Sequence, residues 1–277
     1  MKFKKNLKKT IRDFFLSRNK SSNKYENLRI GVTGAGVQGT LLTEIVEKYG
    51  AKIVAIHDLN LIKAKKLALL RKAELATTDL DKFFTVKMDG LLICTKPKVR
   101  IDPIKLACKK NIHLLIEKPA AYNLVDGQQC LSLIKNANII TSVGFQLRYE
   151  PRYERLKQLV KGHSIHLVRT VCTVDYYLNF RMRDWYLKKN VSGGPIAEQA
   201  IHLLDVARFV LGNPKPTKAT SLAIKNMAMD RTEFDAENSI QLMYEFDSGV
   251  IGVHTNHCGH ERSYFDLELI GPHLRLE

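Results

Sequence analysis

Three titratable residues in the second half of the sequence have the types and spacing that acid–base chemistry needs. Glu198 and His202 lie four residues apart, and Asp205 follows three residues later. On an α-helix this spacing would place the three side chains on or near one face, as an acid–base–acid stripe. Histidine titrates close to neutral pH, so His202 suits a group that accepts a proton. From these residues alone, a satisfied core histidine and a plain surface ion pair stay open as alternatives.

The helix that would carry these residues has a start signal and a stop signal. Pro195 suits a first helical turn and Gly212 suits the position after the last one, which predicts a helix from about Pro195 to Leu211. Its apolar residues would pack on the core of the protein: Ile196, Leu203, Val206, Phe209 and Val210.

Lys118 follows a predicted strand, Ile112–Ile116, in the segment Glu117-Lys118-Pro119. Its ammonium group can donate hydrogen bonds to a developing alkoxide. Pro119 favours an extended backbone at Lys118, as expected at the end of a strand. Taken alone, Lys118 would equally be a solvated lysine at a strand end.

A glycine-rich loop near the N-terminus has the form of a dinucleotide-binding site. The predicted strand Leu28–Thr33 runs into Gly34-Ala35-Gly36-Val37-Gln38-Gly39, and a predicted helix, Thr40–Lys48, follows at once. In such a loop the first glycine permits a tight turn, the second lets the backbone approach a pyrophosphate, and the third lets the helix pack on the strand. The helix N-terminus would offer free N–H groups to the phosphates. Gly34, Gly36, Val37, Gln38 and Gly39 are therefore candidate cofactor-binding residues.

Asp58 ends the next predicted strand, Ala51–His57, and lies 19 residues after Gly39. An acid at about this distance binds the ribose hydroxyls of the cofactor. Because a carboxylate repels a 2′-phosphate, NAD is favoured over NADP, although the nearby lysines 63, 65 and 66 keep NADP as an alternative. The competing interpretation of Asp58 is an N-cap for a helix over Leu61–Leu70.

Three further apolar runs predict strands: Gly90–Thr95, Ile112–Ile116 and Ile139–Gly144. Helical segments separate them, which predicts an α/β fold with a doubly wound, parallel Rossmann sheet. Ligands bind at the carboxyl ends of such strands. The residues expected there join the cofactor-binding candidates: Thr95, Glu117, Lys118 and Gln146.

From about Tyr149 the pattern changes to longer, partly alternating strands. They predict a C-terminal α+β domain with an open, mainly antiparallel sheet and helices on one face: Ile165–Tyr177, Ser239–Phe246, Val250–Cys258 and Tyr264–Ile270. We therefore expect a flexible basic extension over residues 1–27, an NAD(P)-binding domain over residues 28–148, and a substrate and oligomerisation domain over residues 149–277.

The formal net charge of +16 is concentrated at the N-terminus. Residues 1–27 contain nine Lys/Arg and two acidic residues, so they carry +7 and the other 250 residues carry +9. No nucleic-acid-binding motif accompanies this charge, so we expect no nucleic-acid partner. Apolar residues at helical spacing within residues 1–20 could lie on an anionic membrane surface, but a solvated extension is the favoured interpretation.

The five cysteines are scattered and form no C-x-x-C pair, which indicates a reducing, cytoplasmic compartment. His254, His257, Cys258 and His260 have the ligand types that zinc prefers. On a strand, however, His257 would point to the opposite face from the others, and no spaced partner motif exists. We therefore expect no metal site, and His257 or His260 could instead line a substrate pocket.

Several segments together resemble the glucose–fructose oxidoreductase, inositol dehydrogenase and rhizopine-catabolism family (Gfo/Idh/MocA). The resemblance covers roughly residues 28–277, and its motifs occur in order and with the family's spacing. They are Gly34–Gly39, Asp58, Thr95-Lys96-Pro97, Glu117-Lys118-Pro119, Gly144–Tyr149, Ser192–Pro195 and Glu198–Asp205.

This resemblance implies hydride transfer between NAD(P) and a hydroxyl carbon of a polyol or sugar. It implies that Lys118 lies beside the nicotinamide and contacts the reacting hydroxyl, and that His202 accepts the proton. It further implies that the acid at position 198 contacts substrate or steadies the histidine. Family members commonly form homo-oligomers, and a homo-oligomer is expected here.

Three features depart from the family pattern. Glu198 replaces the commoner aspartate, and Arg100 stands where the family often has a histidine. The sequence also stops at Glu277, where family members usually continue, so the second domain is expected to be C-terminally shortened. Two other functions therefore stay open beside an NAD(P)-dependent dehydrogenase. One is a relative that holds and internally recycles NAD, and the other is a shortened, non-catalytic nucleotide-binding protein.

Overall fold

A computed structural model describes residues 25–174, 185, 188–194, 196–225, 235–259 and 262–277. The expectations for the N-terminal extension up to residue 24, for Pro195 and for His260 lie outside these residues. The chain divides into two compact units, Met1–Leu92 and Ile93–Glu277, which are described separately below. Among the described residues, no helix is long and apolar enough to cross a membrane.

The first unit alternates strands with helices. Its elements are β1 (Arg29–Thr33), α2 (Val37–Lys48), β2 (Lys52–His57), α3 (Leu61–Arg71), β3 (Leu75–Thr77), α4 (Leu80–Phe83) and the start of β4 (Gly90–Ile93). β1, β2 and β3 pair in parallel, and every residue of β2 after Lys52 is buried. Burial on both faces explains why the sequence of β2 is a continuous apolar run rather than an alternating one.

The second unit contains the remaining elements, with helical turns between several of them. They are α5 (Ile101–Lys109), β5 (His113–Ile116), α6 (Leu124–Lys135), β6 (Thr141–Val143), α7 (Pro151–Leu159), β7 (Leu167–Val174), α9 (Lys189–Ser192), α10 (Ile201–Val210), β8 (Pro216–Ile224), β9 (Ser239–Phe246), β10 (Ile251–Cys258), β11 (Tyr264–Gly271) and β12 (Leu274–Leu276). A π-helical turn, Ile196–Ala200, directly precedes α10.

The first sheet has the strand order β3-β2-β1-β4-β5-β6, which confirms the predicted doubly wound Rossmann sheet. The order places β1 and β4 at its centre, where the direction of winding changes. β3 was not predicted, because its three residues are too few to give a periodic signal.

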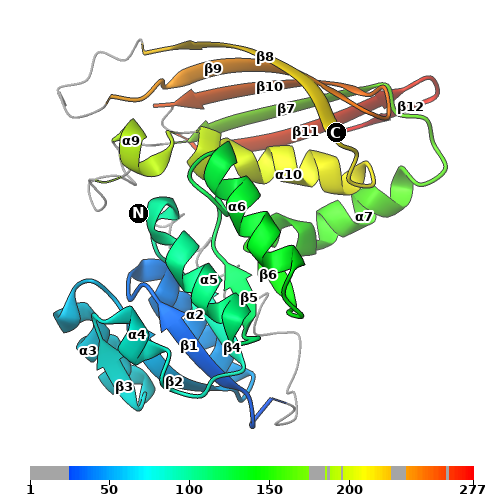
Figure 1. The fold of residues 1–277 in the computed structure, drawn as a ribbon. Helices are drawn as coiled ribbons and strands as arrows, with labels where there is room; N and C mark the ends of the chain where they lie inside the picture. The colour runs from blue at the N-terminus through cyan, green and yellow to red at the C-terminus, as the bar shows by residue number, and fades with distance from the viewer. Residues whose placement is uncertain (1–24, 175–184, 186–187, 195, 226–234, 260–261) are drawn as a thin grey trace. The chain divides into compact units, whose positions relative to one another are not determined.

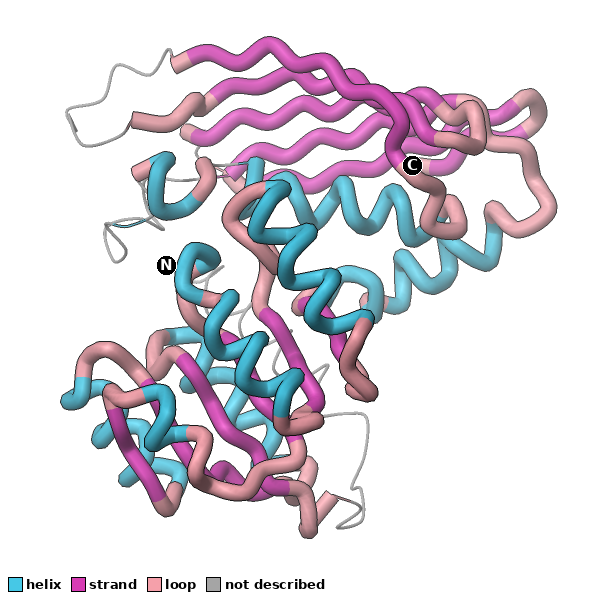
Figure 2. Tube along the Cα trace, viewed as in Figure 1, coloured by secondary structure: helices cyan, strands magenta, loops and turns pink. Residues whose placement is uncertain are grey.

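The second sheet has the order β12-β11-β7-β10-β9-β8, and Figure 2 shows its long strands running side by side. β7 and β10 pair in parallel and the other neighbours are antiparallel, so the expectation of a mainly antiparallel sheet is confirmed. β8 was not predicted because all nine of its residues are exposed and its sequence lacks hydrophobic alternation.

Both α7 and α10 lie on one face of the second sheet (Figure 1). Alternate residues of the strands point at these helices, as the pleat of a strand requires. Val168, Tyr244 and Leu269 from the sheet share a buried cluster with Val206 and Val210 of α10. This core fixes α10, and α10 carries His202 and Asp205.

Gly252 on β10 is required by the packing of Tyr244 on β9. An added Cβ at Gly252 would lie 2.1 Å from two atoms of the buried Tyr244 ring. The ring therefore lies directly against the backbone of the neighbouring strand. Any side chain at position 252 must displace Tyr244 from the core.

We expect Gly252→Ala to lower the free energy of unfolding by about 1–3 kcal/mol, because the core must shift to accept the methyl group. Urea denaturation measures this change. Gly127→Ala is the matched control: its Cβ would meet only Ala121, at 3.7 Å, and Gly127 lies inside α6. That change is expected to be neutral or to stabilise by up to about 1 kcal/mol. Equal stability of the Gly252→Ala variant and the wild-type chain would contradict this packing.

Candidate active site

The glycine-rich loop between β1 and α2 has the geometry that its sequence predicts. Gly34 has a φ of 96° and donates its N–H to the carbonyl of His57 at 2.8 Å. A Cβ at Gly39 would lie 2.0 Å from the Gly34 carbonyl oxygen, so only glycine fits there. At Gly36, by contrast, an added Cβ would meet no atom within 4 Å. The backbone at Gly36 therefore faces open space that a ligand can enter.

The start of α2 adds hydrogen-bond donors to this loop. Gly36 is the N-cap and has no side chain to bond the first amides of the helix. Val37, the first residue of α2, is 61% exposed, and Gln38 follows it in the first turn. Free amides at a helix N-terminus attract anions, so this arrangement suits a pyrophosphate.

Asp58 lies against the same loop. Its Oδ2 accepts the N–H of Ala35 at 2.8 Å, and its Oδ1 accepts the N–H of Asn60 at 2.8 Å. The N-cap of α3 is Asn60, whose side chain accepts from Lys63, so capping by Asp58 does not occur. An ionised carboxylate has acceptor sites beyond these two bonds, which could receive the hydroxyls of a ribose.

Lys118 and Glu198 form a buried ion pair in the second unit. Lys118 Nζ donates to the Glu198 carbonyl oxygen at 2.5 Å and lies 3.2 Å from Glu198 Oε2. The Lys118 side chain is 12% exposed and that of Glu198 is 2% exposed. Contacts to both the backbone and the side chain of Glu198 hold the ammonium in one place, and the pairing offsets the desolvation of both charges.

His202 lies one turn further along, at the start of α10, and is buried. The edge of its ring meets Phe145 in a T-shaped contact, with ring centroids 6.4 Å apart. Within the described structure, His202 Nδ1 has no hydrogen-bond partner. Burial, followed by the positive charge of Lys118, lowers the pKa of the imidazole to about 3. The near-neutral titration expected from the sequence is therefore wrong, and His202 is neutral across the physiological pH range.

Asp205 is bound by Arg148 rather than by His202. Arg148 donates from Nε to Oδ2 at 2.7 Å and from Nη2 to Oδ1 at 2.5 Å, a bidentate pair. The Arg148 guanidinium also lies over the rings of Phe145 and Phe209, at 5.6 and 5.4 Å. Of the two acids in the predicted acid–base–acid stripe, Asp205 is therefore paired with an arginine. This pair instead ties the segment after β6 to α10.

A π-helical turn, Ile196–Ala200, carries Glu198 directly before α10. The predicted α-helix therefore begins at Ile201, and Glu198 precedes it in a wider turn. Two glycines with positive φ, Gly193 and Gly194, precede the turn and give the chain its sharp entry. Glu198 of this turn contacts Lys118.

The other cofactor candidates lie where the strands of this unit end. Thr95 follows β4, and its carbonyl oxygen accepts from Arg100 Nε at 3.0 Å. Glu117 is buried after β5, and its Oε2 accepts the N–H of Lys118 at 3.2 Å. Gln146 is exposed and opens a 3₁₀ turn after β6. Arg100 links the first two segments, because it also donates to the carbonyls of Glu117 and Pro119.

Sequence reasoning gave Arg100 and Arg148 no role in the site. The only signal for Arg148 was its place in the segment Gly144–Tyr149. Arg100 was noted only as a departure from a family pattern. The partner of a long arginine side chain depends on the tertiary fold, so neither contact could be found by spacing along the chain.

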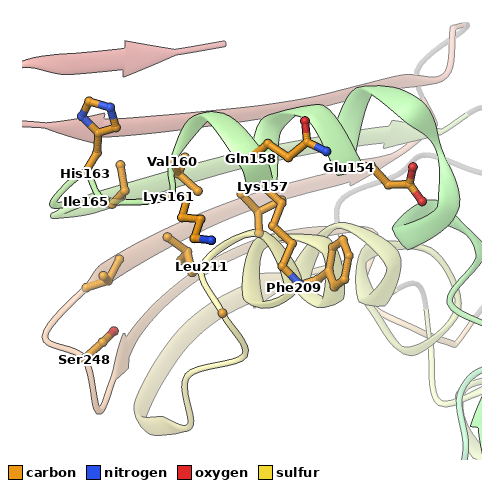
Figure 3. Close-up of a pocket in the computed structure, with 14 residues that line it drawn as sticks. Glu154, Lys157, Gln158, Val160, Lys161, His163, Ile165, Phe209, Leu211 and Ser248 are labelled. Atoms are coloured by element: carbon orange, nitrogen blue, oxygen red, sulfur yellow. The ribbon is translucent and has the colours of Figure 1, made fainter.

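A surface pocket of about 780 Å³ lies between α7 and the C-terminal end of α10 (Figure 3). Lys157 extends over the ring of Phe209, with its Nζ 4.0 Å from the ring centroid, and Leu211 and Lys161 also line the pocket. Glu198 and His202 belong to the opposite end of this helical segment. The pocket is therefore separate from the Lys118–Glu198–His202 group.

The residues considered as zinc ligands lie on opposite faces of β10. His254 and Cys258 are buried on the face toward α10, whereas His257 points to the other face and bonds Ser239 Oγ at 2.8 Å. His254 Nδ1 lies 2.8 Å from Thr170 Oγ1. In the described part of the chain, no group of three or more His, Cys, Asp or Glu residues could hold a metal ion.

Comparisons with known proteins match both halves of the chain. A family model described as an oxidoreductase family with an NAD-binding Rossmann fold matches residues 28–145. A second model, described as the GFO/IDH/MocA C-terminal domain, matches residues 153–277.

Curated relatives include the myo-inositol 2-dehydrogenase of Thermotoga maritima, 24% identical over 241 residues, which are 83% of this chain and 68% of that protein. The scyllo-inositol 2-dehydrogenase (NAD(+)) of Bacillus subtilis is 25% identical over 239 residues, 81% of this chain and 66% of that protein. The chain thus spans about two thirds of the length of these relatives.

Solved structures share the fold. The structure of GenD2 from gentamicin A biosynthesis in complex with NAD has a TM-score of 0.81 and 20% identity, and covers 93% of this chain and 73% of that one. Levoglucosan dehydrogenase in complex with NADH and levoglucosan has a TM-score of 0.78 and 19% identity, over 88% and 71% of the two chains.

The burial of His254 predicts a pH-dependent stability. Burial lowers its pKa from 6.5 to about 4, so the unfolded chain binds a proton more readily than the folded chain. The contribution of His254 to the free energy of unfolding is therefore fully present above pH 6.5. It decreases by about 1.4 kcal/mol for each pH unit as the pH falls toward 4. In the His254→Gln variant, the free energy of unfolding, measured in urea at several pH values, should therefore fall less steeply as the pH decreases. A variant with the same slope as wild type would contradict the assignment.

Proposed function

Because this chain belongs to the GFO/IDH/MocA oxidoreductase family, we propose that it transfers a hydride between NAD(P) and a hydroxyl carbon of a polyol, sugar or sugar derivative. The observation that carries the proposal is the buried Lys118–Glu198 pair with the neutral His202 close by in sequence. The dehydrogenases among the relatives and similar structures act on compounds of this class: inositols and levoglucosan.

The first unit supplies the features that a dinucleotide requires. Open space at Gly36, the N-terminus of α2 and the carboxylate of Asp58 fit a pyrophosphate and an adjoining ribose. Thr95, Glu117 and Gln146, which follow strands in the second unit, remain candidate cofactor-binding residues. When bound, the oxidised cofactor supplies the hydride acceptor.

In the second unit, His202 is proposed as the base that removes the hydroxyl proton. Its low pKa keeps the ring unprotonated and ready to accept a proton. A hydroxyl group becomes strongly acidic as its carbon loses a hydride, because the product without proton loss would be a protonated carbonyl. A weak base is therefore sufficient when proton and hydride leave together.

Lys118 is proposed to donate a hydrogen bond to the reacting oxygen. An ammonium has three donor hydrogens, and the contacts with Glu198 do not use them all. Glu198 holds the ammonium in place, and its carboxylate balances the charge in a site where water is largely excluded. The donor is then positioned before substrate arrives, which lowers the cost of ordering it.

The second sheet supports the further proposal of a homo-oligomer. Leu222, Met243 and Ile251 are large, exposed apolar side chains on β8, β9 and β10. Their register places them on the face of the sheet opposite His254. A second copy covering this face would remove them from water.

We expect the cofactor preference to depend on Asp58. NAD or NADH should raise the unfolding temperature of the chain clearly, and NADP should raise it little, because a carboxylate repels the 2′-phosphate. Asp58→Ala should weaken NAD binding by about 10- to 100-fold, through loss of hydrogen bonds from a charged acceptor. Asp79→Ala, which removes the cap of α4 in the same unit, is the control that keeps the NAD-induced rise. A rise with NADP alone would overturn the role of Asp58.

Turnover should depend on Lys118 and His202. In a screen of polyols and sugars followed by absorbance of the reduced cofactor, Lys118→Met and His202→Gln should each lower kcat by about 10²- to 10⁴-fold and leave the NAD-induced thermal shift in place. Lys189→Met breaks an exposed pair with Glu237 and should change kcat by less than about threefold. Wild-type turnover in the Lys118→Met variant would contradict the mechanism. Nucleotide binding without turnover on any compound would favour the non-catalytic alternative.

A further inference from the structure

Arg100 is a buried arginine at the start of α5, with 3% of its surface exposed. Its guanidinium donates to three backbone carbonyls. Nε and Nη2 donate to Thr95 O at 3.0 and 2.5 Å, and Nη1 donates to both Glu117 O and Pro119 O. One side chain therefore joins the end of β4 to the segment after β5.

The two carbonyls that Nη1 contacts belong to the residues on either side of Lys118. The backbone is thus held immediately before and after the residue whose ammonium meets Glu198. The planar guanidinium presents its donors in a fixed fork, so the three carbonyls are also held relative to one another. A shift of the Glu117–Pro119 segment would carry the Lys118 side chain with it.

The charge of Arg100 belongs to the same buried group. Burial lowers the pKa of its guanidinium to about 10, and the nearby Glu117 and Glu198 carboxylates act against that change. Arg100 therefore stays charged at neutral pH. It adds a second buried cation to the group that contains Lys118 and two carboxylates.

We propose that Arg100 is a positioning residue for Lys118: by binding the carbonyls of Thr95, Glu117 and Pro119, it places the Lys118 ammonium where it meets Glu198 and the reacting oxygen. The kinetic consequence of this inference rests on the proposed function. The placement of Lys118 rests on geometry alone. Arg100 makes no proposed contact with substrate, so its effect passes through the backbone at Lys118.

The placement is tested by amine labelling of the chain. A water-soluble acylating reagent modifies lysines at rates that peptide mass spectrometry can follow, with the exposed Lys98 as internal reference. In the wild-type chain Lys118 should react slowly, because its ammonium is mostly buried and bonded to Glu198. Arg100→Gln should raise the labelling rate of Lys118 relative to Lys98 by about tenfold, since three carbonyl contacts of the guanidinium are lost.

The control is Arg71→Gln. Arg71 is also a mostly buried arginine, and it bonds Glu47 and the carbonyl of Thr40 in the first unit. Its loss removes a comparable set of contacts and should leave the labelling of Lys118 relative to Lys98 unchanged. If Arg100→Gln fails to fold, Arg100→Lys keeps the charge without the fork, and it should raise Lys118 labelling by about threefold.

The kinetic measurement separates positioning from general damage. Arg100→Gln should lower kcat by about 100-fold, as expected for a displaced catalytic group, with KM for NAD within about threefold of wild type. Arg100→Lys should recover part of kcat. A folded Arg100 variant with wild-type labelling of Lys118 and wild-type kcat would overturn the proposal.

The two proposals fail in different ways. If the wild-type chain turns over no polyol or sugar but Arg100→Gln still exposes Lys118 to labelling, the proposed function fails and the positioning role stands. If turnover requires Lys118 but Arg100→Gln changes neither labelling nor kcat, the function stands and the positioning role fails.

Discussion

The rest of the candidate site depends on keeping an ammonium group buried. Lys118 is held by both the carbonyl and the carboxylate of Glu198, and the carboxylate is almost fully removed from water. Removing either partner would leave an unpaired buried charge, which is far more costly than the pair itself. The turn at residues 196–200, the glycines before it and the backbone at Lys118 must therefore be placed together.

Burial and the ammonium of this pair both act on His202. The loss of water, followed by the charge of Lys118, disfavours a second cation, so the imidazole stays neutral. Asp205, three residues further along α10, forms a bidentate pair with Arg148. The two acids of α10 and its preceding turn thus have separate partners. Glu198 pairs with Lys118. Asp205 pairs with Arg148, in the segment that also brings Phe145 against His202.

Much of the fold follows from the sequence because its signals are local. The glycines at 34–39 and the acid at position 58 have fixed roles in a strand–loop–helix unit, and the structure gives them that loop. The strands that were missed are very short or fully exposed, like β3 and β8. The pairing within the site was harder to predict. The partners of Glu198 and Asp205 come from residues 80 and 57 positions away, and spacing along the chain does not reveal such partners.

The protonation state of His202 is the most direct test of this electrostatic account. NMR spectra of the chain with ¹⁵N-labelled histidine, compared with His202→Gln to assign the signal, would follow its ring nitrogens from pH 8 down to the acid limit of the folded state. The account predicts a neutral ring throughout, since its pKa lies near 3. A His202 ring that takes up a proton near pH 6.5, the ordinary value for histidine, would contradict it. In that case, burial and the Lys118 charge would not keep the ring neutral.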